Sequence, residues 1–241
     1  SKFIDGVTNI LLWIPPELFI LLIVIIAWRV AGIGTAIFAL LGSLFIDSVG
    51  YWDDAMKTLS VVLVATLLSI VVGVPVGVLS ALNRTVDAIV RPILDFMQTL
   101  PSFVYLIPAI LLFGLGNVPA VIATFIFAAP PAVRMTTLGI RQVPQDVIEA
   151  SRAFGSTTRQ LLFKVQLPLA IPTIMAGVNQ AIMLALSMAV VASMIGAPGL
   201  GSEVLKGIST VNVGLGFTSG LGIVVLATVL DRITQNLQKK S

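Results

Sequence analysis

Long apolar stretches recur along this chain, and they constrain its fold more than any other feature of the sequence. A helix needs about 20 mostly apolar residues to cross a bilayer core of about 30 Å, because each residue adds about 1.5 Å. Seven stretches match this pattern, although the second is short and contains glycine. The expected spans are Leu12–Trp28, Gly32–Asp47, Met56–Leu82, Phe96–Gly114, Val118–Gly139, Ile171–Ile195 and Val213–Leu230. The pattern therefore predicts an all-α fold, a polytopic transmembrane helical bundle.

The balance of apolar and charged residues supports the same fold class. Hydrophobic residues make up 57% of the chain and charged residues only 10%. A soluble domain carries about 25% charged residues, so the surplus of apolar side chains must face lipid. No polar block is long enough to separate two globular domains, and we expect one bundle.

The residue types that the sequence lacks exclude several kinds of chemistry. It contains no histidine and no cysteine, so we expect no metal site and no catalytic residue of either type. A nucleotide-hydrolysing loop needs a lysine preceded by glycine, and none of the lysines here follows glycine. The chain is therefore not expected to be an enzyme or to bind a cofactor itself. Its basic residues form no single patch, which argues against a nucleic-acid partner.

The distribution of basic residues between the loops predicts an orientation in the membrane. With the C-terminus in the cytoplasm, eleven of the fourteen Lys and Arg residues lie inside, Lys239 and Lys240 among them. Only Lys2, Lys57 and Lys206 then lie outside. Acidic residues are divided almost evenly, as expected for a bias that concerns basic residues alone. The sequence thus predicts that the N-terminus is outside and the C-terminus inside.

One long polar segment, residues 141–168, separates the fifth and sixth expected spans, and the charge bias places it in the cytoplasm. Apolar residues at helical spacing, including Ile148 and Phe154, predict a first helix from Gln145 to Ala153. Gly155 is expected to end this helix, since glycine readily adopts positive φ. A Ser or Thr among residues 156–158 can cap a second short helix, and Pro168 is expected to open the next span. Such a hairpin either docks a cytoplasmic partner or packs under its own bundle.

The spacing within this segment resembles the EAA motif of binding-protein-dependent ABC importer permeases. That motif is Glu-Ala-Ala, three residues, Gly, nine residues, and Ile-x-Leu-Pro. Here the sequence has Glu149-Ala150-Ser151, Gly155 and Val165-Gln166-Leu167-Pro168 at the same spacing, with Ser151 and Val165 as the departures. The resemblance implies that this hairpin couples the chain to a separate ATPase. The coupling residues that it implies are Glu149, Ala150, Ser151, Gly155, Leu167 and Pro168.

Further stretches are similar to the glycine betaine/proline betaine subfamily of these permeases. They include Leu94-Asp-Phe-Met-Gln-Thr-Leu-Pro101, Gly139-Ile-Arg-Gln-Val-Pro144 and Ile195-Gly-Ala-Pro-Gly-Leu-Gly201. The resemblance implies a type I importer permease for quaternary-ammonium compatible solutes in a bacterial or archaeal cytoplasmic membrane. Residues 1–50 would be N-terminal scaffold spans and residues 51–241 the core permease domain.

The same resemblance implies the partners of the chain. They are an ATP-binding cassette subunit that holds ATP and magnesium, a substrate-binding protein, and a second copy of the chain in a homodimer within the lipid bilayer. The pore would lie between the two copies, and no nucleic acid is implied.

Residues that line a pore are harder to predict. Asn179, Met183 and Ser187 recur at steps of four in the sixth expected span, so they lie close to one helix stripe. Tyr105, between two prolines, offers an aromatic wall for a quaternary ammonium group. Plain helix packing explains these residues as well. The segment Gly196–Gly201 is expected to form an outer turn, as a gate, a docking site or an ordinary turn.

Two other classes of function remain open at this point. A secondary carrier or channel for small polar solutes would share the apolar spans. Ion-coupled carriers usually place ionisable groups near the midplane, whereas the nearest cases here, Asp95 and Arg134, fall near the cytoplasmic ends of their spans. A membrane enzyme is disfavoured, because His, Cys and carboxylate pairs within a span are missing.

Overall fold

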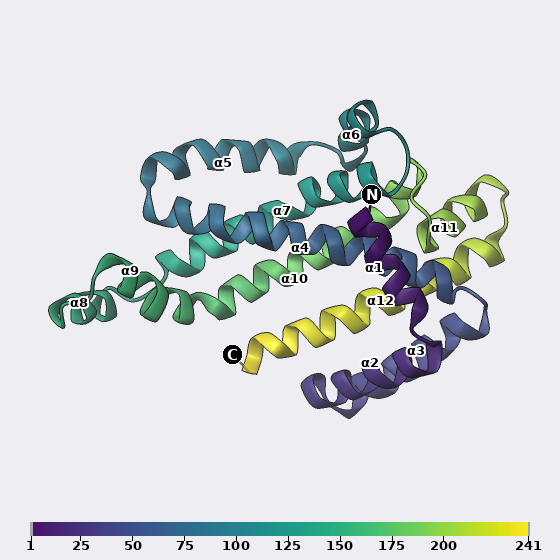
Figure 1. Ribbon diagram of the computed structural model, residues 1–241, viewed down its shortest axis with the longest axis horizontal. Helices are drawn as coiled ribbons and strands as arrows, with labels where there is room; N and C mark the ends of the chain where they lie inside the picture. The colour runs from purple at the N-terminus through teal and green to yellow at the C-terminus, as the bar shows by residue number, and fades with distance from the viewer. Residues whose placement is uncertain (1, 241) are drawn as a thin grey trace.

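The computed structural model describes residues 2–240, with side chains through Leu237, and Figure 1 shows its arrangement. All regular elements in this part of the chain are helical, which confirms the predicted all-α class. The helices are α1 (Lys2–Trp13), α2 (Pro16–Ala31), α3 (Ile33–Ser48), α4 (Trp52–Leu82), α5 (Arg84–Thr99), η1 (Ser102–Tyr105), α6 (Leu106–Phe113), α7 (Asn117–Arg141), α8 (Gln145–Ala153), α9 (Thr158–Leu161), η2 (Leu162–Gln166), α10 (Leu167–Ser193), α11 (Leu200–Ser209) and α12 (Val213–Lys240). The side chains of Lys239 and Lys240, and the whole of Ser241, lie outside the described part.

Three long helices, α4, α7 and α10, form the centre of the bundle and lie side by side along its length (Figure 1). Glycines at their contacts allow the backbones to approach closely. A Cβ atom at Gly77 of α4 would lie 2.7 Å from the carbonyl oxygen of Val133 in α7. Likewise, a Cβ at Gly177 of α10 would lie 2.9 Å from the carbonyl oxygen of Pro131. Close packing through small residues is how helices associate in lipid, where burial of apolar area offers little driving force.

Helices α2 and α3 cover α12 at the edge of this core, whereas α1 packs on α4. Ala27 of α2, Ala36 and Ala39 of α3, and Val229 of α12 form one buried apolar cluster. The division into a scaffold of residues 1–50 and a core of residues 51–241 stays a prediction.

The first expected span, Leu12–Trp28, is wrong as a single helix. The chain forms two helices there, α1 and α2, whose axes meet at 95°. The break falls at Pro15 and Pro16, because proline disfavours helical conformation in the residue before it and supplies no N–H. Pro16 then opens α2. An N–H group at this first helical position would have no hydrogen-bond partner within the helix, so its absence from proline costs nothing there.

The fourth expected span, Phe96–Gly114, is also broken. Helix α5 ends at Thr99, Leu100 is extended with ψ 132°, and the following helices η1 and α6 turn away by 110°. Pro101 accounts for the extended residue before it. Pro108, by contrast, lies in the first turn of α6 and is tolerated there.

The number of straight spans is therefore smaller than expected. Within the described residues, four helical segments are long and apolar enough to cross a membrane: α4, α7, Thr158–Ser193, and α12 through Leu237. Counting each bent pair as one span gives six. The prediction of seven was wrong because it included α3, which has 16 residues and is too short for a full crossing at about 1.5 Å per residue. Six crossings would put both termini on the same side, so the predicted outside position of the N-terminus depended on the wrong count. The cytoplasmic position of the C-terminus and of residues 141–168 stays a prediction.

Candidate functional site

The polar segment between α7 and α10 forms a hairpin that projects at one end of the molecule (Figure 1). Its first helix, α8, has the predicted bounds, Gln145 to Ala153, and starts directly after Pro144. Gly155 has φ 80°, and its N–H donates to the carbonyl of Arg152, 2.9 Å away. The prediction that Gly155 ends the helix is thus confirmed.

The second arm of the hairpin starts with a reciprocal cap. The Thr157 hydroxyl accepts from the N–H of Gln160 at 3.3 Å, and the Gln160 side chain accepts from the N–H of Thr157 at 2.9 Å. This capping box satisfies two N–H groups at the start of α9 that have no partner within the helix. The expectation of a Ser or Thr cap is confirmed, and Thr157 is the residue that provides it.

The junction between the hairpin and the next span differs from the prediction. Pro168 does not open a separate helix, because α9, η2 and α10 run as one segment from Thr158 to Ser193. A π-helical turn over Leu162–Gln166 joins them, and the N–H of Leu167 donates to the carbonyl of Leu162. The wider turn lets Pro168, which has no N–H, follow without ending the helix. The second arm of the hairpin is therefore continuous with α10.

The two faces of the hairpin differ in character. Val143, Ile148 and Leu161 are buried against one another on the inner face. Glu149 and Ala150 are exposed on the outer face, and the Phe154 side chain at the tip is 92% exposed. The helical spacing grouped Phe154 with the apolar residues of the first helix, but α8 ends at Ala153 and Phe154 follows it with its side chain exposed. An aromatic side chain that is exposed beside the motif residues is suited to bind a partner.

The four residues predicted to line a pore do not lie together. Tyr105 is buried, packs edge-to-face on Phe127 and donates to the carbonyl of Met97. Asn179 is half-buried and donates to the Asp231 carboxylate at 2.9 Å. Both residues are thus engaged within their own subunit. Met183 and Ser187, in contrast, lie on an exposed stripe of α10.

Asp231 is a residue that sequence reasoning placed only among the cytoplasmic charges. Its carboxylate accepts hydrogen bonds from Asn179 and from the Gln235 side chain, at 2.9 and 2.7 Å, and so ties α10 to α12. The one feature of the sequence that could have singled out Asp231 is its position as an acidic residue directly after an apolar stretch.

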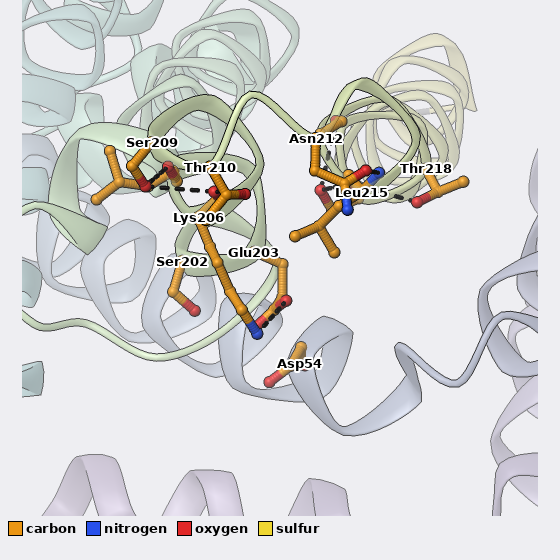
Figure 2. Close-up of polar contacts among 12 residues, drawn as sticks. Asp54, Ser202, Glu203, Lys206, Ser209, Thr210, Asn212, Leu215 and Thr218 are labelled. Carbon is orange, nitrogen blue, oxygen red and sulfur yellow. Dashed lines mark hydrogen bonds and ion pairs between the residues drawn. The ribbon is translucent and has the colours of Figure 1, made fainter.

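At the opposite end of the bundle, the segment Gly196–Gly201 forms a turn that leads into an unpredicted helix, α11 (Figure 1). Gly196 and Gly199 have φ values of 86° and 128°. The N–H of Leu200 donates to the Thr58 hydroxyl of α4 at 2.8 Å, which fixes the start of α11. Figure 2 shows the Glu203–Lys206 ion pair on α11 and Asn212 at the start of α12, where its side chain accepts from the N–H of Leu215.

A bundle with this helix order and a projecting hairpin defines the class of the protein, the membrane-spanning subunit of an ABC importer. The fold matches a chain of the methionine ABC transporter MetNI in an inward-facing conformation, with a TM-score of 0.68 and 25% identity. The match covers 76% of this chain and 92% of that one.

The chain belongs to the family of binding-protein-dependent transport system inner membrane components, whose profile matches residues 73–241. It is 55% identical over 240 residues to the glycine betaine transport system permease protein OpuAB of Bacillus subtilis, covering 100% of this chain and 85% of that protein. It is 52% identical over 238 residues to the glycine betaine/proline betaine transport system permease protein ProW of Escherichia coli, covering 99% of this chain and 67% of that protein. The chain is therefore a multi-pass permease component, and the resemblance drawn from the EAA motif is confirmed at the level of the family.

Proposed function

We propose that this chain is the permease subunit of an importer for quaternary-ammonium compatible solutes such as glycine betaine and proline betaine. The observation that carries the proposal is the hairpin, which has EAA spacing, a continuous connection to α10 and an exposed tip. The substrate class is supported by the two relatives above, both of which are named for glycine betaine. A separate ATPase subunit holds ATP and magnesium, and a separate binding protein delivers the solute from outside.

The hairpin transmits force because of how it is anchored. Its inner face packs on itself through Val143, Ile148 and Leu161. Its second arm shares a buried cluster with Ile140 of α7 through Leu162, and it continues into α10. When ATP closes the ATPase subunits, the hairpins move with them, and α10 moves as the extension of the hairpin. Access then alternates between the two sides by rigid-body motion of packed helices.

A second copy of the chain completes the pore. Helix α10 presents an exposed stripe that includes Met183 and Ser187, which retain their proposed role as lining residues. Helix α5 buries only Leu94 among its described side chains and exposes Ile89, Ile93 and Phe96. A face of this kind is covered by lipid or by the partner copy. Tyr105 and Asn179 support the walls from behind, through the contacts described above.

Uptake in proteoliposomes tests the proposal. The chain is reconstituted with the ATPase and the binding protein, and radiolabelled glycine betaine is supplied outside. Uptake is expected only when both partners and ATP are present. Uptake driven by a sodium or proton gradient alone, without the ATPase, would instead identify a secondary carrier, and passive equilibration would identify a channel.

A further inference from the structure

A cleft of about 380 Å³ lies between α5 and α7, at the end of the bundle where the charge bias predicts the cytoplasm. Charged residues of both signs line it, three arginines and two aspartates. None of these residues belongs to the EAA motif or to the predicted pore stripe. The cleft is thus a polar site that the coupling hairpin and the α10 stripe leave unexplained.

Charges alternate along the wall that α5 contributes. Asp87, Arg91 and Asp95 follow one another at steps of four residues, so they share one face of the helix at intervals of about 6 Å. The α5 helix that carries them starts at a cap, since the Asn83 side chain accepts from the N–H groups of Thr85 and Val86. Arg91 therefore has an aspartate about one helical turn away on either side.

The facing wall, on α7, supplies the complementary charges. Arg141 contacts the Asp87 carboxylate at 2.9 Å, and Arg134 contacts that of Asp95. The Arg134–Asp95 pair is open to water, because these side chains are 42% and 59% exposed, whereas the Asp87 side chain is only 18% exposed. An ion pair as exposed as Arg134–Asp95 is worth about 1 kcal/mol or less, so a charged solute can compete with it. Val90, Leu94, Val133 and Leu138 form the apolar part of the lining.

The combination of positive groups, negative groups and apolar side chains in the cleft favours one kind of ligand. A simple anion would meet the two carboxylates, and a simple cation would meet the three guanidinium groups. A small zwitterion satisfies both, with its carboxylate at an arginine and its ammonium group at an aspartate. Methyl groups on the ammonium fit the apolar part of the lining. We propose that this cleft is a low-affinity site for the zwitterionic solute at the inner end of its path.

The cleft is also connected to the hairpin. Arg141 is the last residue of α7, directly before the turn that leads into α8, and it donates to the carbonyl of Ser80 at 2.6 Å as well as to Asp87. Movement of the hairpin therefore displaces one wall of the cleft against the other. The proposal rests on the proposed function, because it takes the transported solute as the ligand.

The test measures binding in the absence of the binding protein. The permease–ATPase complex is placed in phosphatidylcholine nanodiscs, and binding of radiolabelled glycine betaine is followed by equilibrium dialysis. We expect a dissociation constant in the millimolar range, with choline and acetate competing about tenfold more weakly. Arg134→Gln and Asp95→Asn are each expected to weaken binding about tenfold, and Arg134→Lys to weaken it less.

The control variant breaks an ion pair away from the cleft. Lys57 contacts Asp54 at 3.1 Å near the start of α4, and these side chains are 32% and 25% exposed. Lys57→Gln is therefore expected to leave binding unchanged. Arg134→Gln is further expected to reduce the preference for glycine betaine over choline, a change that mere loss of a structural ion pair would not produce.

Three outcomes would decide against the proposal or redirect it. If the wild-type complex transports glycine betaine with the binding protein but binds none without it, the cleft is not a solute site and the proposed function stands. Phosphatidylglycerol added to the nanodiscs tests for a lipid headgroup. If it displaces glycine betaine, and the Arg134 and Asp95 variants change only this displacement, the cleft holds an anionic lipid headgroup and the proposal fails. If the complete system transports no betaine, the proposed function fails. In that case, binding of the zwitterion proline to the wild type but not to Arg134→Gln would still support a zwitterion site in the cleft.

Discussion

The hydroxyl groups of Ser151 and Ser156 lie 3.0 Å apart and form a hydrogen bond across the turn at the tip of the hairpin. Ser151 occupies the position where the EAA motif has its second alanine. The departure from the motif therefore adds a link between the end of α8 and the segment that leads into α9. It leaves the exposed face with Glu149 and Ala150 unchanged.

The Ser151→Ala variant restores the motif and removes this hydrogen bond. We expect a loss of about 1 kcal/mol in local stability and a change in ATP-driven uptake of less than about twofold, because the hydroxyl points into the turn. Thermal unfolding and uptake by the reconstituted complex measure the two effects. Ser156→Ala should give the same loss of stability, and the double variant should add little to it. A large loss of uptake would show that Ser151 itself contacts the ATPase.

Phe154 is expected to be an anchor for the ATPase, because 92% of its side chain is exposed beside the motif. Truncating an aromatic anchor costs about 2 kcal/mol or more of binding. Phe154→Ala should therefore weaken binding of the ATPase about 30-fold, as measured by fluorescence titration of the detergent-solubilised permease. Phe3→Ala, which removes an aromatic side chain that is 63% exposed on α1, serves as the control. Equal affinities for the two variants would refute the anchor.

Gly155 permits a test that separates charge from conformation. No atom outside its immediate surroundings lies within 4 Å of a Cβ built at this residue, so a side chain fits there without a clash. Its φ of 80° strains an alanine by about 1 kcal/mol, whereas Asn and Asp tolerate this region better. Gly155→Asp is expected to insert normally and to uncouple ATP hydrolysis from transport. Gly155→Asn, of the same shape but uncharged, should retain more coupling, and normal transport by Gly155→Asp would contradict the coupling role.

Gly77 tests the packing of the central helices. A Cβ at this residue would lie 2.6 Å from the Cβ of Thr136 and 2.7 Å from the backbone oxygen of Val133. Neither atom is the end of a flexible side chain, so Gly77→Ala should separate α4 from α7 at a cost of about 1–3 kcal/mol. Thermal unfolding in detergent measures the loss. Gly220→Ala in α12, where no atom lies within 4 Å, is the matched control and should not lower the melting temperature.

The features predicted correctly from the sequence are mostly local ones. The bounds of α8, the positive φ of Gly155 and the cap of α9 depend on residues within a few positions of one another. Turn and cap chemistry is encoded at that range. Pro15 and Pro101 account for where two of the expected spans break, but the bends of 95° and 110° depend on how the following helices pack.

Contacts between distant residues could not be predicted from one sequence. Asp87 and Arg141 are 54 positions apart, and Asn179 and Asp231 are 52 apart, so their proximity depends on the tertiary arrangement. For the same reason, helical spacing alone groups Asn179 with Met183 and Ser187. Spacing defines a stripe, but it does not show which neighbouring helix covers part of it.

Cross-linking at the tip of the hairpin tests the central claim, that this hairpin couples the chain to a separate ATPase. The sequence contains no cysteine, so Ala153→Cys introduces a single thiol at an exposed residue beside Phe154 and leaves the aromatic side chain in place. A short reagent that joins this thiol to lysines is applied to the proteoliposomes in which the complex transports glycine betaine. We predict that Ala153→Cys forms a cross-link to the ATPase and that uptake then stops, while Phe3→Cys does neither. Normal uptake by a complex in which Ala153→Cys never cross-links to the ATPase would contradict the account.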